Sequence, residues 1–257
     1  MSIALLLCLA AVAGPALVGV DPNRQDLLGR LAPPVGFGGT AAHPLGTDAL
    51  GRDVLARLVA GARVSLLVGL TATAGAGAIG ITFGALAGWV GGPVDRAVAW
   101  LSDVQAALPF VVVAITAVAA LGNGLVPVLV TLVLTGWVGY ARVVRFQTRG
   151  IRQAAWIESA VALGAGPSRL VLRHVVPHLL GTAAILATQQ VSAMILYEAS
   201  LSYLGLGIGG AVVTWGGMAA EGQEALLKAP WVTAVPGAAV ALTVLGLNLL
   251  GDAVAER

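Results

Sequence analysis

The sequence predicts an all-α membrane protein with six transmembrane helices. Hydrophobic residues make up 58% of the 257 residues, charged residues only 10%, and the mean hydropathy is +0.92. Soluble domains carry about 25% charged residues, so this composition excludes an ordinary soluble protein. A bilayer core about 30 Å thick requires roughly 20 apolar residues per helix. Six segments approach that length, at residues 3–20, 64–90, 98–121, 125–140, 176–197 and 232–250.

The first apolar segment resembles a signal peptide in length, but it has no basic start and no clear small-residue cleavage site before Asp21-Pro22. We therefore expect an uncleaved transmembrane helix at 1–20, followed by an extracytoplasmic loop at 21–63. The single cysteine, Cys8, excludes an internal disulfide and a cysteine-based metal site.

Glycines mark one face of the second segment. Gly80, Gly84 and Gly88 follow one another at a spacing of four, so this face of the helix is almost bare backbone. Small residues allow membrane helices to approach closely, and we expect this face to pack tightly against another helix. The alternative is that these positions only reflect the high glycine content, 35 residues in all.

The distribution of arginine predicts the orientation, because cytoplasmic loops are enriched in Arg and Lys. The loop at 141–175 carries six arginines against one acid, Glu158, and we place it in the cytoplasm. With six spans, both termini then lie inside and the 21–63 loop lies outside. The outer loop holds five arginines, which counts against this orientation, but it also holds four aspartates. The net charge of +2 thus reflects membrane-flanking loops and does not indicate nucleic-acid binding.

The chain shows no motif for ATP binding or hydrolysis. Its only lysine, Lys228, follows Leu227, so it lacks the Gly-Lys pair of a phosphate-binding loop. It contains neither H-E-x-x-H nor G-x-S-x-G. We expect no catalysis and no cofactor in this chain, and uphill transport would need an energy source on a partner.

One stretch interrupts the apolar sequence, IESAVALGAGPSRLVLRHVVPHLL at 157–180. Between 151 and 163, apolar residues interleave with polar ones as in a short amphipathic helix. Gly164 is a natural helix stop and Pro167 a natural restart. The sequence predicts a helix, a tight turn and a second helix outside the bilayer; a basic loop without a special role is the plain alternative.

This stretch resembles the E-A-A-x3-G-x9-I-x-L-P motif of permease subunits of binding-protein-dependent ABC importers. Glu158-Ser159-Ala160 is followed after three residues by Gly164, and after nine more by His174-Val175-Val176-Pro177. Ser159 replaces the usual second Ala, and His174 the usual Ile. Three further stretches, at 43–70, 198–208 and 236–254, resemble the "C" partner of the dipeptide, oligopeptide and nickel permease heterodimers. One departure is the absence of the basic residues that usually precede the first span.

The resemblance covers nearly the whole chain and implies the type I ABC importer permease fold. Its transmembrane domain of five helices would occupy 64–252, with a cytoplasmic coupling loop at 141–175. The implied machine contains this chain, a homologous "B" permease, two ABC ATPase subunits or domains that bind ATP and Mg, and an extracytoplasmic solute-binding protein. It would lie in the cell membrane of a prokaryote.

In that machine the helix–turn–helix is the coupling helix, which docks in a cleft on the ATPase. The expected ATPase-coupling residues are Glu158, Ser159, Ala160, Gly164, Arg169, Arg173, His174 and Pro177. Arg169 and Arg173 would be available for acidic residues of the partner; ordinary solvated loop charge is the alternative.

Two more groups of polar residues are candidates. Ionisable groups within spans usually face the bundle interior or a cavity, so the translocation path is a possible place for Asp103, Glu198, Ser200 and Ser202. Pinning of helices by hydrogen bonds, or simple solvation of Asp103, is the alternative. Asp48, Arg52, Asp53 and Arg57 have the i, i+4 spacing of ion pairs on a helix, and they are also candidates for docking the binding protein.

The transported substrate is left open by these motifs. We favour di- and oligopeptides over nickel or a metal chelate. The spans hold no cluster of His, Cys or Met for a metal, but this absence decides little, because the resemblance implies that the binding protein largely sets the specificity and that a metal can travel as a chelate. Two other classes of function are a membrane scaffold that recruits a cytoplasmic protein and a channel that needs no ATP. ATP-dependent uptake into vesicles distinguishes these three classes.

Overall fold

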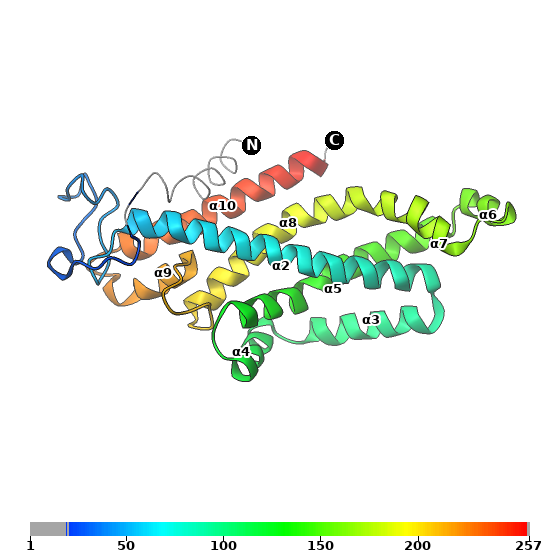
Figure 1. The fold of residues 1–257 in the computed structure, drawn as a ribbon, viewed down its shortest axis with the longest axis horizontal. Helices are drawn as coiled ribbons and strands as arrows, with labels where there is room; N and C mark the ends of the chain where they lie inside the picture. Colours follow the sequence, from blue (N-terminus) through cyan, green and yellow to red (C-terminus); the bar gives the residue numbers. More distant parts are fainter. Residues whose placement is uncertain (1–18, 20, 256–257) are drawn as a thin grey trace.

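The computed structural model of the chain describes residues 19 and 21–255. Most of these residues are helical, and apart from one isolated bridge between Thr47 and Asp53 they form no β-structure. Figure 1 shows helices α2, α5 and α8 running along the long axis of the molecule. Helices α6 and α7 extend from one end, here called the projecting end, and α9 lies toward the other, here called the α9 end (Figure 1).

Four helices are long and apolar enough to cross a membrane: α2 (Val54–Val90), α5 (Leu125–Arg152), Val171–Tyr203, which includes α8 (Val176–Tyr203), and α10 (Trp231–Ala255). A fifth span is possible if the bent pair α3 (Gly92–Ala107) and α4 (Phe110–Leu121) is one broken crossing. The predicted first span, apart from Gly19, lies outside the described residues. An all-α membrane protein is thereby confirmed, with four or five spans in the part described.

The prediction of one continuous helix over 98–121 was wrong. Helices α3 and α4 meet at an angle of 91°. Pro109 has no amide hydrogen for a helix, and proline disfavours helical backbone at the residue before it. Leu108 is accordingly extended, with φ −84° and ψ 124°. The apolar composition of the segment concealed this break.

Helix α2 begins at Val54, earlier than the predicted start at Val64. Asp53 caps it, because its carboxylate accepts a hydrogen bond from the amide of Ala56 at 2.7 Å. The helix therefore extends into the segment that we expected to be loop. With about 1.5 Å of rise per residue, its 37 residues exceed the bilayer core, and one or both ends must project from it.

Helix α5 also exceeds its predicted span of 125–140 and continues to Arg152. The predicted amphipathic helix at 151–163 is present only as α6 (Ala155–Ala162), after a break at Gln153 and Ala154. The remaining short elements are η1 (Leu27–Gly29), α7 (Pro167–Leu170), the π-helical turn η2 (Val171–Val175), α9 (Trp215–Glu221) and η3 (Gln223–Ala225).

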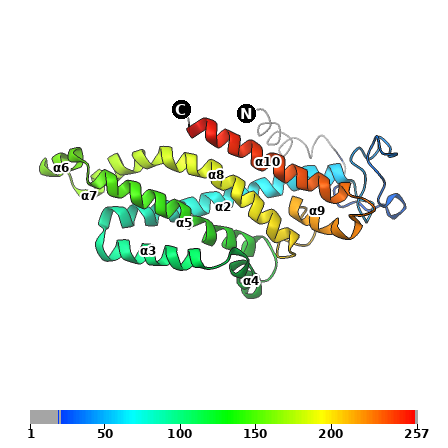
Figure 2. The same ribbon diagram turned by 180° about the vertical axis from the view of Figure 1, so that it is seen from behind.

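The glycine face of α2 lies against α5. A β-carbon at Gly84 would stand 2.7 Å from the carbonyl oxygen of Ala141, and one at Gly88 would stand 2.6 Å from that of Arg145. At Gly80 it would meet the carbonyl oxygen of Trp137. Any side chain at these three positions would force the two helices apart, which explains the bare face. Figure 2 shows α3 alongside α5, and α3 also contacts α2.

Candidate functional site

The projecting segment, residues 153–175, contains the predicted helix–turn–helix. Helix α6 ends in a Schellman turn, in which the amide of Gly164 donates to the carbonyl of Val161 at 2.9 Å and that of Ala165 donates to Ala160 at 3.0 Å. Gly164 adopts φ +86°, a conformation that favours glycine. Pro167 then opens α7. A β-carbon at Gly164 would meet no other atom within 4 Å. The preference for glycine therefore comes from the backbone conformation of the turn and not from crowding by neighbouring atoms.

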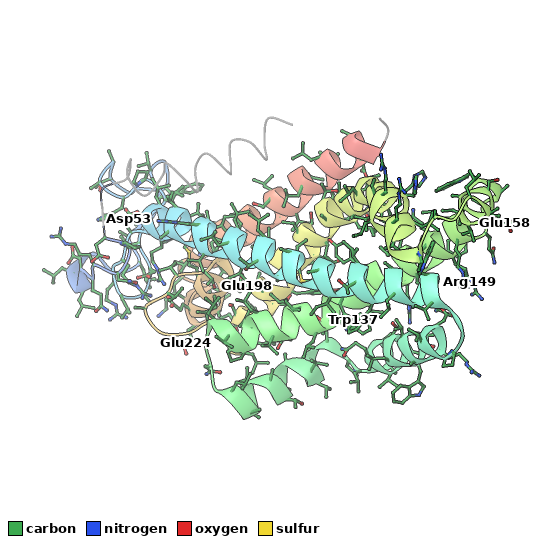
Figure 3. All side chains as sticks on the ribbon, turned by 45° about the vertical axis from the view of Figure 1, so that its right-hand side comes forward. Asp53, Trp137, Arg149, Glu158, Glu198 and Glu224 are labelled. Carbon is green, nitrogen blue, oxygen red and sulfur yellow. The ribbon has the colours of Figure 1, made fainter. Side chains whose placement is uncertain are left out.

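Helix α6 displays apolar and charged side chains that the chain itself leaves uncovered. Ile157 is buried, but Trp156, Val161 and Leu163 are exposed, Leu163 at 90%. Glu158 and Ser159 are also exposed, and Figure 3 shows Glu158 at the far tip of the molecule. Exposed apolar side chains gathered at one place indicate a surface for a partner.

The base of the projecting segment is shaped by two of the predicted motif residues. His174 packs edge-on against Trp156, with ring centroids 5.4 Å apart. Pro177 stands in the first turn of α8 and follows η2, in which the amide of Val176 reaches back to the carbonyl of Val171. Proline removes a helical donor, and such π-turns are common where a helix carries a local function. Arg169 and Arg173 are exposed on the same segment.

The charges of the projecting segment have no partner within it. Among the described residues, Glu158, Arg169 and Arg173 form no ion pair. Glu158 lies with Arg149 and Arg152 around a polar cavity of about 360 Å³ between α6 and the ends of α2, α3 and α5. Glu158 of α6 therefore lies across a polar cavity from the ends of α2, α3 and α5.

Helix α8 connects the projecting segment to a buried polar cluster near the α9 end. Glu198 on α8 is completely buried, and its carboxylate accepts hydrogen bonds from Ser65 on α2 at 3.0 Å and from Ser202 at 2.7 Å. The hydroxyl of Thr214, which caps α9, donates to Ser202 at 3.3 Å. Glu198 therefore joins α2, α8 and α9 and is closed off from solvent in this structure.

The other residues proposed for the path are more open. Asp103 pairs with Arg142 at 2.9 Å on an exposed face, and Ser200 lines a cavity of about 450 Å³ beside α9 and α10. Its hydroxyl donates to the carbonyl of Leu196. Of the four path candidates, then, Glu198 and Ser202 belong to one buried cluster, and Asp103 and Ser200 lie apart from it.

Residues 48–53 do not form the helix that we expected to carry their ion pairs, because α2 begins only at Val54. Asp48 nevertheless pairs with Arg52 at 2.6 Å and with Arg57 at 2.5 Å. Arg57 also contacts Glu221 at the end of α9, at 2.7 Å. Asp53 caps α2 and contacts His43 at 2.7 Å. These groups bind one another and fasten α9 to the start of α2.

The surroundings of Asp48 keep its carboxyl charged. Burial alone would raise its pKa, but the amides of Arg52 and Leu50 and the guanidinium groups of Arg52 and Arg57 outweigh burial. Together they hold the pKa below the ordinary 3.8. The Asp48 carboxyl is therefore ionised at neutral pH.

Several side chains that form these ion pairs and hydrogen bonds were not predicted from the sequence. Glu221, Ser65 and Thr214 gave no local signal, because each reaches its partner only through the fold. The pairing of Asp95 on α3 with Arg145 on α5 was also missed. Within residues 21–255, no group of three or more His, Cys, Asp and Glu side chains is placed to hold a metal ion.

Comparison with known proteins identifies the family. The model for the "binding-protein-dependent transport system inner membrane component" matches residues 80–257. The chain belongs to this family. It is 34% identical to the oligopeptide transport system permease protein OppC of Bacillus subtilis, over 97% of this chain and 80% of that protein. It is 37% identical to the dipeptide permease DppC of the same organism, over 97% of this chain and 77% of that protein.

A nickel transport permease, NikC of Escherichia coli, is 33% identical over 98% of this chain and 89% of that protein. The resemblance to the "C" permeases drawn from the sequence is thus confirmed, and this permease is an ABC importer subunit. Its fold is similar to a chain of the MetNI methionine ABC transporter in an inward-facing conformation, with a TM-score of 0.62 at 19% identity. That match covers 77% of this permease and 94% of the MetNI chain and supports the type I importer fold.

Proposed function

We propose that this permease forms half of the translocation path of an ATP-driven importer of di- and oligopeptides. The observation that carries the substrate class is the similarity over at least 97% of the chain to permeases named for oligopeptides and dipeptides. Import of nickel or a metal chelate is the second candidate, favoured by the match to NikC.

The ATPase subunits of this importer would bind ATP and Mg and dock on the projecting segment. Three observations support this assignment: the uncovered apolar side chains of α6, the unpaired charges beside them, and the absence from the sequence of a phosphate-binding Gly-Lys pair. Glu158, Ser159, Ala160 and Gly164 would form the contact. Arg169 and Arg173 would meet acidic residues of the ATPase, and His174 and Pro177 would hold the segment on α8.

Helix α8 gives this docking a mechanical consequence. It runs without interruption from Val176 to Tyr203, which corresponds to about 42 Å, and carries Glu198 toward its far end. Closure of the ATPase pair would move α6 and thereby shift the populations of inward-open and outward-open states. ATP can drive that shift only through a difference in affinity between the two states.

In this arrangement the projecting end lies in the cytoplasm of a prokaryote and both termini lie inside. A homologous "B" permease covers the open faces of the bundle. The α9 end then faces the solute-binding protein. Because Asp48, Arg52, Asp53 and Arg57 are engaged with each other and with Glu221, their part in docking is to hold the shape of this surface.

Reconstitution tests the proposal. The permease, its "B" partner, the ATPases and the binding protein are placed in proteoliposomes, and uptake of a labelled dipeptide and of Ni²⁺ is measured with and without ATP. We expect accumulation of dipeptide only with ATP. Accumulation of Ni²⁺ alone would favour the second candidate, uptake without ATP would indicate a channel, and no uptake of any solute would favour a scaffold.

A further inference from the structure

Another cavity lies at the bend between α3 and α4, apart from the projecting segment. Its volume is about 320 Å³, and it is bounded by the end of α3, the first residue of α4, the middle of α5 and Tyr197 of α8. Its lining includes Leu108, Phe110, Gln105, Thr135, Arg142 and Tyr197. In membrane-spanning helices, polar groups usually face a water-filled cavity or a partner. A cavity with four polar side chains is therefore a place for a polar solute.

The polar side chains of this cavity keep hydrogen-bonding capacity that the fold does not use. Within the described part of the chain, the Gln105 amide and the Tyr197 hydroxyl have no hydrogen-bond partner. The ring of Tyr197 is nevertheless fixed, because it stacks on Phe110 with centroids 4.6 Å apart. Thr135 donates its hydroxyl to the carbonyl of Thr131 at 2.8 Å, and its oxygen remains free to accept. These groups are positioned but have unused hydrogen-bonding capacity.

Arg142 brings a positive charge to the cavity. Its only ion pair in the described residues is with Asp103, at 2.9 Å, and the two side chains are 51% and 73% exposed. Exposed ion pairs of this kind are weak and easily exchanged. A guanidinium has five N–H donors and binds carboxylates in a bidentate manner. Arg142 therefore has donors available for a second carboxylate.

The start of α4 borders the same cavity, because Phe110, its first residue, is one of the lining residues. Pro109 precedes the helix and supplies no side-chain cap. The first amides with an acceptor in the described residues are those of Val112 and Val113, which both donate to the carbonyl of Pro109. The amides of Phe110 and Val111 are thus unpaired. In transporters, broken helices present such N-terminal ends to anionic groups of the substrate.

We propose that this cavity is a station for the free α-carboxylate of a peptide during its passage through the permease. Arg142 and the first amides of α4 hold the carboxylate, Gln105 and Tyr197 bind the adjacent peptide group, and Leu108 and Phe110 contact the last side chain. When the peptide leaves, Arg142 pairs with Asp103 again, so that the carboxylate is bound only briefly. This inference rests on the proposed function, in that it takes the substrate to be a peptide.

The test compares two substrates in the complete reconstituted importer. Initial ATP-dependent uptake is measured for dialanine with a free carboxylate and for its C-terminal amide, each with saturating binding protein. The binding protein is the same in every experiment, so its preference between the acid and the amide does not vary. A change in the ratio of the two uptake rates between permease variants therefore reports on the permease alone. For Arg142→Gln we expect this ratio to fall by about tenfold or more, through slower uptake of the acid only. Arg142→Lys keeps the charge and should lie in between.

Arg96→Gln is the matched control, because Arg96 is an exposed arginine of α3 outside the cavity, seven residues before Asp103. Its acid-to-amide ratio should equal that of the wild type. An equal slowing of both substrates in Arg142→Gln would show that Arg142 serves the fold or the partner permease and would overturn the inference. If the wild-type complex imports neither dipeptide, the proposed function itself fails, which is a distinguishable result.

Discussion

At the α9 end, Asp48, Arg52, Arg57 and Glu221 bind one another, whereas at the projecting end Glu158, Arg169 and Arg173 have no ionic partner among the described residues. Trp215 of α9 is almost completely buried between α2 and α8, while Leu163 beside α6 is 90% exposed. The α9 end also has exposed apolar side chains, among them Leu28 and Phe37. The two ends therefore differ chiefly in their charges, which are paired within the chain at the α9 end and not paired within the described residues at the projecting end.

This contrast separates residues that stabilise the chain from residues that bind a partner. A substitution at the α9 end should act on the stability of this chain, because it removes contacts that the chain makes with itself. A substitution in the projecting segment should act mainly on assembly and transport, because the exposed side chains there make few contacts with the rest of the chain. The following predictions test that separation, from the largest expected effect to the smallest.

The largest effect is expected for Gly164→Asp. A side chain at φ +86° costs about 1–2 kcal/mol in the turn and places a carboxylate on the docking surface. We expect the ATPases to be lost from the purified complex and transport to be abolished, while the permease remains in the membrane. Gly166→Asp is the control, since Gly166 has no positive φ. Normal ATPase co-purification with Gly164→Asp would contradict the coupling role.

At the α9 end, Arg57→Leu should destabilise the chain itself. Arg57 is 4% exposed, and its loss leaves the buried carboxylate of Asp48 without one of its two cations. Breaking such a pair costs about 3 kcal/mol, and we expect this loss in the free energy of unfolding in mixed micelles. Arg63→Leu, at an exposed position of the same helix, is the control. Unchanged unfolding with lost binding-protein docking would instead make Arg57 a docking residue.

Glu198→Ala should lower the free energy of unfolding by about 2 kcal/mol, because it leaves the buried hydroxyls of Ser65 and Ser202 without their hydrogen-bond acceptor. The same unfolding experiment measures it. Ser200→Ala, two positions along α8 and exposed, should change stability by less than about 0.5 kcal/mol. If both variants unfold like the wild type and only transport by Glu198→Ala falls, Glu198 lines the path in another state.

The smallest effect is a dependence on pH. Because the pKa of Asp48 is lowered in the folded chain, its contribution to stability is present above the ordinary 3.8 and is lost as the pH falls through the lower, folded value. The free energy of unfolding, measured between about pH 5 and pH 2, should therefore fall more steeply for the wild type than for Asp48→Asn. Parallel curves would show that Asp48 is not held ionised by its neighbours.

The projecting segment could be predicted from the sequence because its signals are local. Glycine is favoured at helix ends and proline at helix starts through the local backbone, and the neighbours of Gly164 and Pro167 along the chain are also their neighbours in space. The glycine face of α2 was predicted for the same reason, as a pattern within one helix. Its partner helix, α5, could not be named from that pattern.

The α9 end could not be predicted in this way. Arg57 and Glu221 are 164 residues apart in the sequence, and the Ser65 hydroxyl reaches Glu198 across 133 residues. Only the packing of α2, α8 and α9 brings them together. The bend at Pro109 is an intermediate case. The proline is plain in the sequence, but the span was predicted from the hydropathy of a window of residues, and that average takes no account of a missing amide hydrogen. The unpaired amides at the start of α4 followed from that bend and were missed with it.

Cysteine cross-linking tests the central contrast most directly. In a Cys8→Ala background, Ser159→Cys on α6 and Leu50→Cys at the α9 end each provide one exposed thiol. A short bifunctional reagent is then applied to the assembled importer. We predict that Ser159→Cys is linked to an ATPase subunit, with a yield that changes on ATP binding, and that Leu50→Cys is linked only to the binding protein. An ATPase that co-purifies but links to Leu50→Cys, and never to Ser159→Cys, would contradict the account.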